Sequence, residues 1–270
     1  MLEFLQYEFI RNAIFAALLA SVACGVVGVY VVVNRIVFLS DGISHAAFGG
    51  IGLGYFLGLN PIYSAIAFSI AVAVGVGTSS KKLGAREDTV IGVIWALGMA
   101  VGIAFIKLTP GYVPDLFSYL FGNILTVPRS DLVVMLVLDI ILLLMVVLLF
   151  KELLAISFDR EFAQTLRIPV NLIYNILLTL VALTVVILIR VVGVILVMAL
   201  LTIPAAVSEI FAKRLLHLML GATVLSLLFT LLGIWLSYLT NLPSGATIVL
   251  LASAIFFLTL LYSRHTKLLS

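Results

Sequence analysis

Two ionisable side chains occur together in an otherwise apolar segment, within Ser40-Asp-Gly-Ile-Ser-His-Ala-Ala-Phe-Gly-Gly50. Asp41 and His45 are four residues apart, so a helix would place both on one face, with Cβ atoms about 5–6 Å apart. A carboxylate with an imidazole suits zinc, manganese or ferrous iron, and suits Cu(I) less because that ion favours thiolates and thioethers. The pair therefore predicts a site for a divalent transition metal. A hydrogen bond that only neutralises two buried polar groups, or a proton relay, is the alternative.

Small residues recur every four positions beside this pair. A ladder of this kind lets another helix backbone approach closely, as in small-xxx-small packing. The ladder consists of Gly42, Ala46, Gly50, Gly54 and Gly58. We therefore expect a tight helix contact next to Asp41 and His45, at which a gate could operate.

The composition of the chain determines the kind of element that must carry these residues. Hydrophobic residues make up 64% of the 270 residues, mean hydropathy is +1.34, and charged residues reach only 10%, against about a quarter in a typical globular protein. Such a chain cannot build a water-soluble surface, and its apolar runs do not alternate as the strands of a transmembrane β-barrel do. The predicted fold class is all-α, a polytopic helical membrane protein, with residues 1–270 forming a single transmembrane domain surrounded by membrane lipid.

Nine apolar segments approach the roughly 20 residues that cross a bilayer core. They are 10–33, 37–58, 62–78, 89–107, 132–150, 170–189, 193–211, 215–239 and 246–262. The segment 193–211 contains Pro204 and could be broken or re-entrant, which would leave eight full spans. His45 lies about 12 Å into a core of about 30 Å, at 1.5 Å of rise per residue, and is therefore close to the midplane.

The distribution of basic residues predicts the orientation. Most of the lysines and arginines fall in one set of loops, which the positive-inside rule assigns to the cytoplasm. The N-terminus is then outside and the C-terminus cytoplasmic. The net charge is only +3, and the basic residues are scattered, so a nucleic-acid partner is not expected.

Other polar residues lie in or near the apolar segments. A charged group there costs about 2.5–3.5 kcal/mol on insertion scales and is a functional candidate by default. Asp139 has no charged neighbour in its own segment and could join a metal path, although a hydrogen bond to another helix is the simpler interpretation. Glu209 and Lys213 are four residues apart and are expected to form an ion pair.

The connection 151–169, expected on the cytoplasmic side, contains a short helix pattern. Asp159 is a candidate N-cap with Glu161 in the first turn. Phe158, Phe162 and Leu166 recur at i, i+4 and i+8 and would form an apolar stripe. The stripe could rest on the membrane surface or dock into a groove of another protein.

Several common nucleotide-binding and catalytic motifs are absent from the sequence. It contains no G-x-x-x-x-G-K-[ST] phosphate loop, no dinucleotide fingerprint, no H-E-x-x-H and no G-x-S-x-G. We therefore expect no nucleotide hydrolysis by this chain and no enzyme activity of its own.

Four short motifs, in the right order and spacing, resemble the permease subunit of the zinc/manganese/iron uptake class of prokaryotic ABC transporters. They occupy residues 34–45, 119–125, 158–168 and 192–206. The resemblance implies that Asp41 and His45 contact the transported metal, and that the loop 157–168, with Phe158, Asp159, Glu161, Phe162 and Leu166, is a coupling helix that meets the ATPase. It also implies a homodimeric permease, two ATPase copies, an extracytoplasmic metal-binding protein, and no permanently bound cofactor.

One rival function remains open from the residues alone. In a proton-coupled secondary transporter, Asp41 and His45 would relay protons. Internal inverted repeats would favour that rival, and none is evident in the sequence. The residues also leave open which of zinc, manganese and iron is carried.

Overall fold

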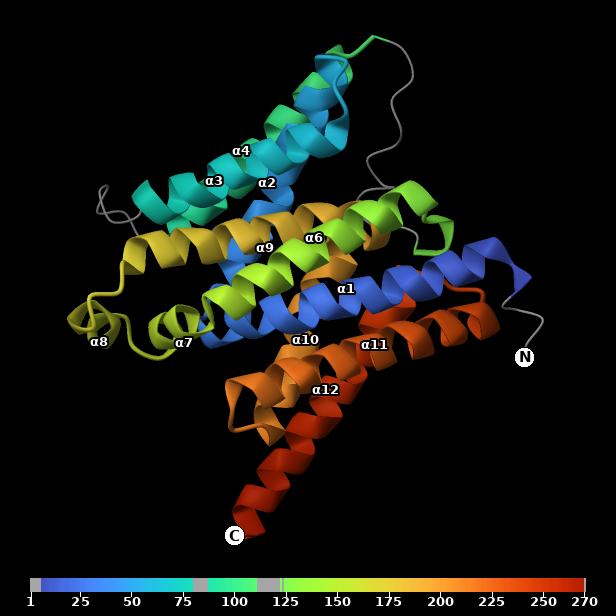
Figure 1. The fold of residues 1–270 in the computed structure, drawn as a ribbon. Helices are drawn as coiled ribbons and strands as arrows, with labels where there is room; N and C mark the ends of the chain where they lie inside the picture. Colours follow the sequence, from blue (N-terminus) through green and yellow to red (C-terminus); the bar gives the residue numbers. More distant parts are fainter. Residues whose placement is uncertain (1–5, 80–86, 111–121, 123, 270) are drawn as a thin grey trace. The chain divides into compact units, whose positions relative to one another are not determined.

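In a computed structural model the chain is helical throughout the part described, which comprises residues 6–79, 87–110, 122 and 124–269. Within these residues, nine long helices overlap the nine predicted segments (Figure 1). They are α1 (Glu8–Val33), α2 (Val37–Phe56), α3 (Pro61–Ser79), α4 (Glu87–Leu108), α6 (Arg129–Leu148), α9 (Val170–Val192), α10 (Val194–Phe211), α11 (Leu215–Thr240) and α12 (Ser244–Leu269). Three short elements complete them: the 3-10 helix η2 (Ile124–Thr126), α7 (Phe150–Phe158) and α8 (Arg160–Thr165).

Seven of the nine long helices are long and apolar enough to cross a membrane, and α3 contributes a shorter apolar helix over Pro61–Gly77. The remaining long helix, α2, carries Asp41, His45 and several glycines, which lower its hydropathy. The predicted all-α polytopic fold is confirmed. The segment with Pro204 is one continuous helix, α10, so the alternative of a break inside it is not observed.

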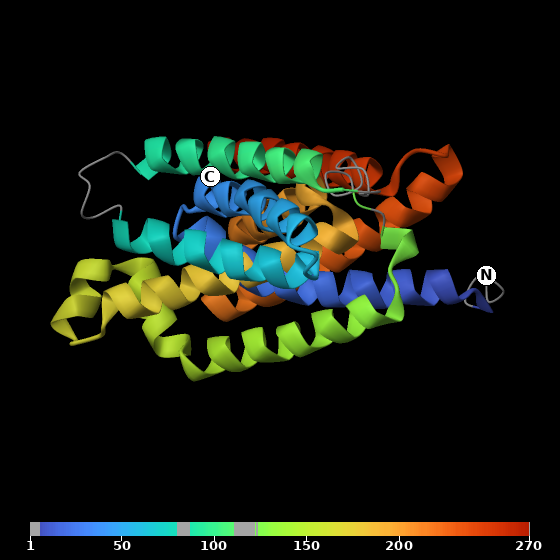
Figure 2. The same cartoon turned by 90° about the horizontal axis from the view of Figure 1, so that it is seen from above.

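Two compact units make up the chain. One contains residues 1–32, 117–141 and 190–270, and therefore α1, most of α6, and α10 to α12. The other contains residues 33–116 and 142–189, and therefore α2 to α4, α7, α8 and most of α9. In the second unit α2 packs against both α3 and α4, and the three helices run side by side in both views (Figures 1 and 2). In the first unit α10, α11 and α12 pack against one another.

A single glycine separates α9 from α10. Gly193 has φ 78° and ψ 159°, a backbone conformation essentially restricted to glycine because a Cβ would clash there. Gly122, itself at φ 57°, packs directly on the backbone of Val192 and Gly193. Glycines from two of the four motifs thus meet at this turn, and side chains at either position would separate the backbones. The other residues at 119–121 and 123 lie outside the described part.

Candidate metal site

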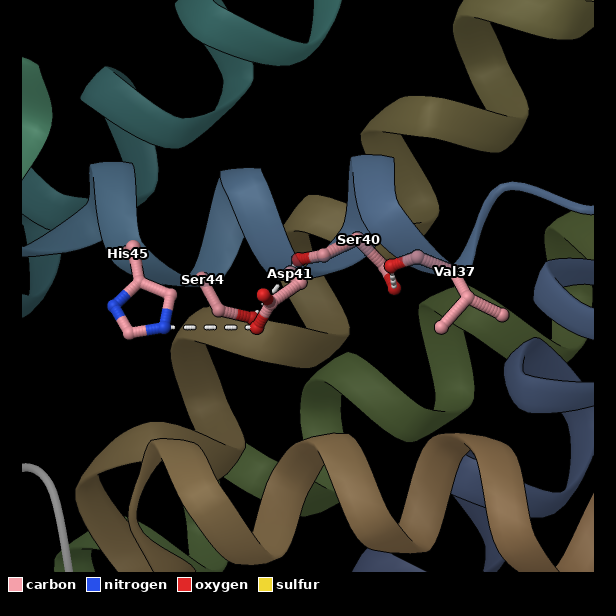
Figure 3. Close-up of polar contacts among 5 residues, drawn as sticks. All are labelled: Val37, Ser40, Asp41, Ser44 and His45. Atoms are coloured by element: carbon pink, nitrogen blue, oxygen red, sulfur yellow. Dashed lines mark hydrogen bonds and ion pairs between the residues drawn. The ribbon is translucent and has the colours of Figure 1, made fainter. Parts of the chain in front are cut away.

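Asp41 and His45 lie on the same side of α2 (Figure 3). His45 Nε2 is 3.6 Å from Asp41 Oδ1, and the two side chains keep only 14% and 21% of their surface exposed. The i, i+4 spacing therefore brings the predicted pair together, half-buried and within reach of one ligand.

The neighbouring serine hydroxyls donate to the backbone of α2. Ser40 Oγ donates to Val37 O at 2.7 Å, and Ser44 Oγ donates to Ser40 O at 2.9 Å (Figure 3). Both hydroxyls thus bond to the backbone of their own helix. His45 Nδ1 is buried without a hydrogen-bond partner among the described residues, so Nε2 is the ring nitrogen that faces Asp41 and could share a ligand with it.

Aromatic rings from two helices enclose His45. Trp95, on α4, stacks on the imidazole with ring centroids 4.5 Å apart and planes 24° apart. Phe48, one turn further along α2, lies 6.4 Å away at 23°. These rings restrict the rotation of the imidazole, and Trp95 is a site residue that sequence reasoning missed. Nothing in a single-sequence pattern indicates that α4 presents this residue to α2.

The small-residue ladder packs against two helices. A Cβ at Gly50 would lie 2.7 Å from Ala65 Cα and 2.7 Å from Ser64 O, and one at Gly54 would lie 2.8 Å from Pro61 Cα, so these two glycines face α3. Gly42 and Ala46 face α4 instead, in contact with Ile91 and Gly98 respectively. The predicted close packing beside the site is confirmed at these four positions.

Gly58 is a correction to that prediction. It lies beyond the end of α2 with φ 66°, and an added Cβ would meet no described atom within 4 Å. Its role is to turn the chain after the helix, as glycine does at helix C-termini. The four-residue spacing of the ladder continues past the end of α2, so it wrongly predicted that Gly58 takes part in close helix packing.

A second small-residue contact was missed. Gly52 meets Gly102 of α4, and Gly98 of α4 meets Ala46. Gly98 and Gly102 form a G-x-x-x-G pattern, so the signal for a close helix contact was present in the sequence.

We expect Gly50→Leu to impair folding or assembly of the permease by a few kcal/mol, because its side chain must push α3 away from α2. The matched control is Gly92→Leu in α4, where an added Cβ meets no described atom within 4 Å. Thermal stability in detergent, with uptake measured in parallel, checks this. A stable, active Gly50→Leu protein would remove the argument for close packing beside the site.

The donor set on one chain is small. Within the described residues no group of three or more His, Cys, Asp or Glu side chains is placed to hold a metal ion. Two donors bound to one ion at about 2.1 Å in tetrahedral geometry lie about 3.4 Å apart, close to the 3.6 Å between Nε2 and Oδ1. Asp41 and His45 can therefore share one cation but leave its coordination incomplete.

Asp139 is buried in α6, with 8% of its surface exposed. Its Oδ2 has no hydrogen-bond partner among the described residues. No interhelical hydrogen bond is therefore made by this oxygen within the described part, and the role of Asp139 stays a prediction.

The connection 151–169 forms two short helices. Asp159 Oδ1 accepts from the backbone N–H groups of Glu161 and Phe162, both at 2.9 Å, which confirms the predicted N-cap of α8. The same residue, at φ −153° and ψ 108°, ends α7. Phe158 therefore belongs to α7 and Leu166 follows α8, so the expected single amphipathic helix is wrong: capping by Asp159 interrupts it. Phe158, Phe162 and Leu166 are 73%, 58% and 56% exposed.

Two contacts attach these short helices to the rest of their unit. Asn34 Nδ2 donates to Ser157 Oγ at 2.9 Å, three residues before α2 begins. The guanidinium of Arg160 lies 4.2 Å from the ring centroid of Tyr174 on α9, a cation–π distance. The exposed stripe is thereby connected to the start of the helix that carries Asp41 and His45.

Comparison with known proteins decides the family. The profile of the ABC 3 transport family matches residues 6–263. The chain belongs to the ABC 3 transport family. As a member it is the membrane permease subunit of an ABC transport system, a transporter component and not an enzyme.

Individual relatives of this ABC 3 permease cover nearly its whole length. An uncharacterized membrane protein of Synechocystis is 49% identical over 98% of this chain and 94% of its own. The manganese transport system membrane protein MntC of Listeria monocytogenes is 33% identical over 98% and 94%. Among solved structures, "PsaBC from Streptococcus pneumoniae in complex with Fab" superposes with a TM-score of 0.88 at 31% identity, covering 99% of both chains.

Proposed function

We propose that this ABC 3 permease carries a divalent transition metal into the cytoplasm, with manganese as its physiological cargo, and that Asp41 and His45 contact the ion. The observation that carries the proposal is the pair itself: a carboxylate oxygen and an imidazole nitrogen 3.6 Å apart on one face of α2. Oxygen and imidazole donors without thiolates suit manganese, zinc and iron. The choice of manganese follows the relatives named as manganese transport proteins.

The assembly that we propose contains two copies of the permease, two cytoplasmic ATPases and an extracytoplasmic metal-binding protein. The ion is substrate, and no resident cofactor is invoked. The permease lies in the prokaryotic cell membrane with its N-terminus outside and its C-terminus in the cytoplasm, because most basic loop residues are then cytoplasmic.

Coupling to the ATPase takes place through the exposed stripe of Phe158, Phe162 and Leu166. A displacement of α7 and α8 would be transmitted to the start of α2 by the Asn34–Ser157 hydrogen bond. It would be transmitted to α9 by the contact between Arg160 and Tyr174. All of these residues belong to the same compact unit as Asp41 and His45, so a movement at the stripe has a short route to the site helix.

Uptake into proteoliposomes tests the proposal. Vesicles with the permease and its cognate ATPase should accumulate ⁵⁴Mn²⁺ only with ATP and the metal-binding protein present. Vesicles with permease alone should be inert even under an imposed pH gradient, whereas a proton-coupled carrier would run on that gradient. ATP-independent, gradient-driven uptake by the permease alone would overturn the proposal.

We expect Phe162→Asp and Leu166→Asp to uncouple the complex, because each charges an apolar surface that docks on the ATPase. Metal-stimulated ATP hydrolysis and co-purification of the ATPase should both fall about tenfold or more, since an unpaired charge in a contact costs at least about 1–3 kcal/mol. The permease itself should remain folded, because both side chains are exposed.

The matched control is Gln164→Asp. This position is also exposed on α8 but, two residues from Phe162, it faces away from the stripe. Normal hydrolysis and co-purification in both stripe variants would show that the coupling assignment is wrong.

A further inference from the structure

A hollow in the first unit lies where α10 ends and α11 begins. Its volume is about 680 Å³, within the range of about 300–1,000 Å³ typical of ligand sites. Ten residues line it: Ser208, Phe211, Ala212, Lys213, Arg214, His217, Leu220, Gly221, Val224 and Leu225. The site of Asp41 and His45 is not part of it.

The mouth of this hollow is basic. Lys213, Arg214 and His217 are exposed and follow one another at the loop and in the first turn of α11. No carboxylate is among the lining residues. The expected Glu209–Lys213 ion pair does not form: within the described chain the ion pairs join Asp41 to His45 and Glu8 to Arg129. The two fixed positive charges are therefore unneutralised by the described part of the protein.

The rest of the lining is mainly apolar and belongs largely to α11. Leu220 and Val224 lie one turn apart on α11 and are 58% and 57% exposed, and Phe211 at the end of α10 is 67% exposed. Gly221 has no side chain to fill the space between them, and its Cα faces the Ser208 hydroxyl. That hydroxyl already donates to Leu218 O at 3.0 Å, so it is engaged in joining α10 to α11.

The position of the hollow relative to the bilayer follows from its helices. Both α10 and α11 are apolar enough to span the membrane, so the three residues between them lie at a membrane surface. Basic residues there, with exposed apolar side chains leading into the membrane, match an amphiphile with an anionic head and apolar tails. Basic pockets between transmembrane helices on the cytoplasmic side are typical sites for anionic lipid head groups.

We propose that this hollow binds one anionic phospholipid of the cytoplasmic leaflet. Lys213 and Arg214 hold its phosphodiester, His217 supplies a further ring N–H donor, and Phe211, Leu220 and Val224 contact its acyl chains. A free phosphate ion offers the same anionic oxygens to the basic residues as the lipid head group does. The exposed apolar side chains of the lining add contacts that only the acyl chains of a lipid can make.

Native mass spectrometry of the full permease–ATPase complex, titrated with dioleoyl phosphatidylglycerol, tests this. The wild-type complex should retain the lipid, while dioleoyl phosphatidylcholine, which has the same chains and no net charge, should bind at least tenfold more weakly. Lys213→Gln should weaken retention about fivefold, and the double variant Lys213→Gln/Arg214→Gln about 30-fold. Each substitution removes one basic contact with the lipid head group, and each such contact contributes about fivefold to the affinity. Ala212→Phe, which fills the hollow and keeps both charges, should also lower retention.

The matched control is Lys151→Gln, an exposed lysine on α7 outside the hollow, which should change retention less than twofold. Equal binding of both lipids, or unchanged retention in the double variant, overturns the proposal. Displacement of the lipid by millimolar inorganic phosphate would assign the hollow to a free anion. Loss of the ATPase from the double variant with lipid retention intact would assign these residues to a protein contact, and either result overturns the lipid assignment.

Discussion

Asp41→Asn and His45→Ala are each expected to lower manganese uptake by about 100-fold while the ATPase stays bound to the permease. Asparagine keeps the size of aspartate but removes the anionic donor, and alanine removes the imidazole. Loss of a residue that only orients a metal ligand typically costs 10–100-fold in metal affinity or activity, so loss of a ligand itself should cost at least as much. No third His, Cys, Asp or Glu joins the pair within the described part of the chain. Uptake of ⁵⁴Mn²⁺ in proteoliposomes, with co-purification of the ATPase measured on the same preparation, checks both variants.

The matched control for these variants is Ser44→Ala. Ser44 lies between the two residues on α2 and is buried, and its hydroxyl donates to the backbone of its own helix. Removing it changes the polarity of the same segment without removing a donor from the pair, so uptake should stay within about twofold. Near-normal uptake in Asp41→Asn or His45→Ala would show that the pair does not carry the ion.

Sequence reasoning located the elements because their signals are local. Apolar runs of about 20 residues predict spanning helices whatever they pack against. All nine predicted segments are helices in the described part of the chain, and seven of them are long and apolar enough to span a membrane. Asp159 was predicted as a cap because its side chain bonds to N–H groups two and three residues away. The pairing of Asp41 with His45 needed only the helical repeat.

Contacts between distant segments were not predictable in this way. The helical repeat places Asp41 and His45 on one face of α2, but it does not say which helix covers that face, so the stacking of Trp95 on His45 was missed. The packing of Gly122 on the turn at Gly193 was missed for the same reason. The end of α2 was also misjudged, because the spacing of small residues continues to Gly58, two residues past the helix end at Phe56.

The incomplete donor set has a consequence for the dimer. Zinc usually takes four protein or water ligands, and manganese takes more, whereas no third His, Cys, Asp or Glu joins Asp41 and His45 among the described residues of one chain. A two-fold axis repeats the pair and offers two carboxylates and two imidazoles without a further intramembrane residue. We therefore expect one metal site shared by two protomers. Separation of the two copies of α2 would then remove half of the ligands and release the ion, as alternating access requires.

A covalently linked permease dimer with Asp41→Asn in one half tests the shared site. If the two pairs bind one ion, this single lesion damages the only pathway, and uptake should fall about tenfold or more below that of the linked wild type. If each protomer has an independent site, the unmodified half continues to work and uptake should be roughly half of the wild-type rate. The linked dimer with Ser44→Ala in one half controls for the effect of substituting one α2. The half-rate result would exclude a shared site, since one intact Asp41 cannot sustain half of the flux through a site that needs both.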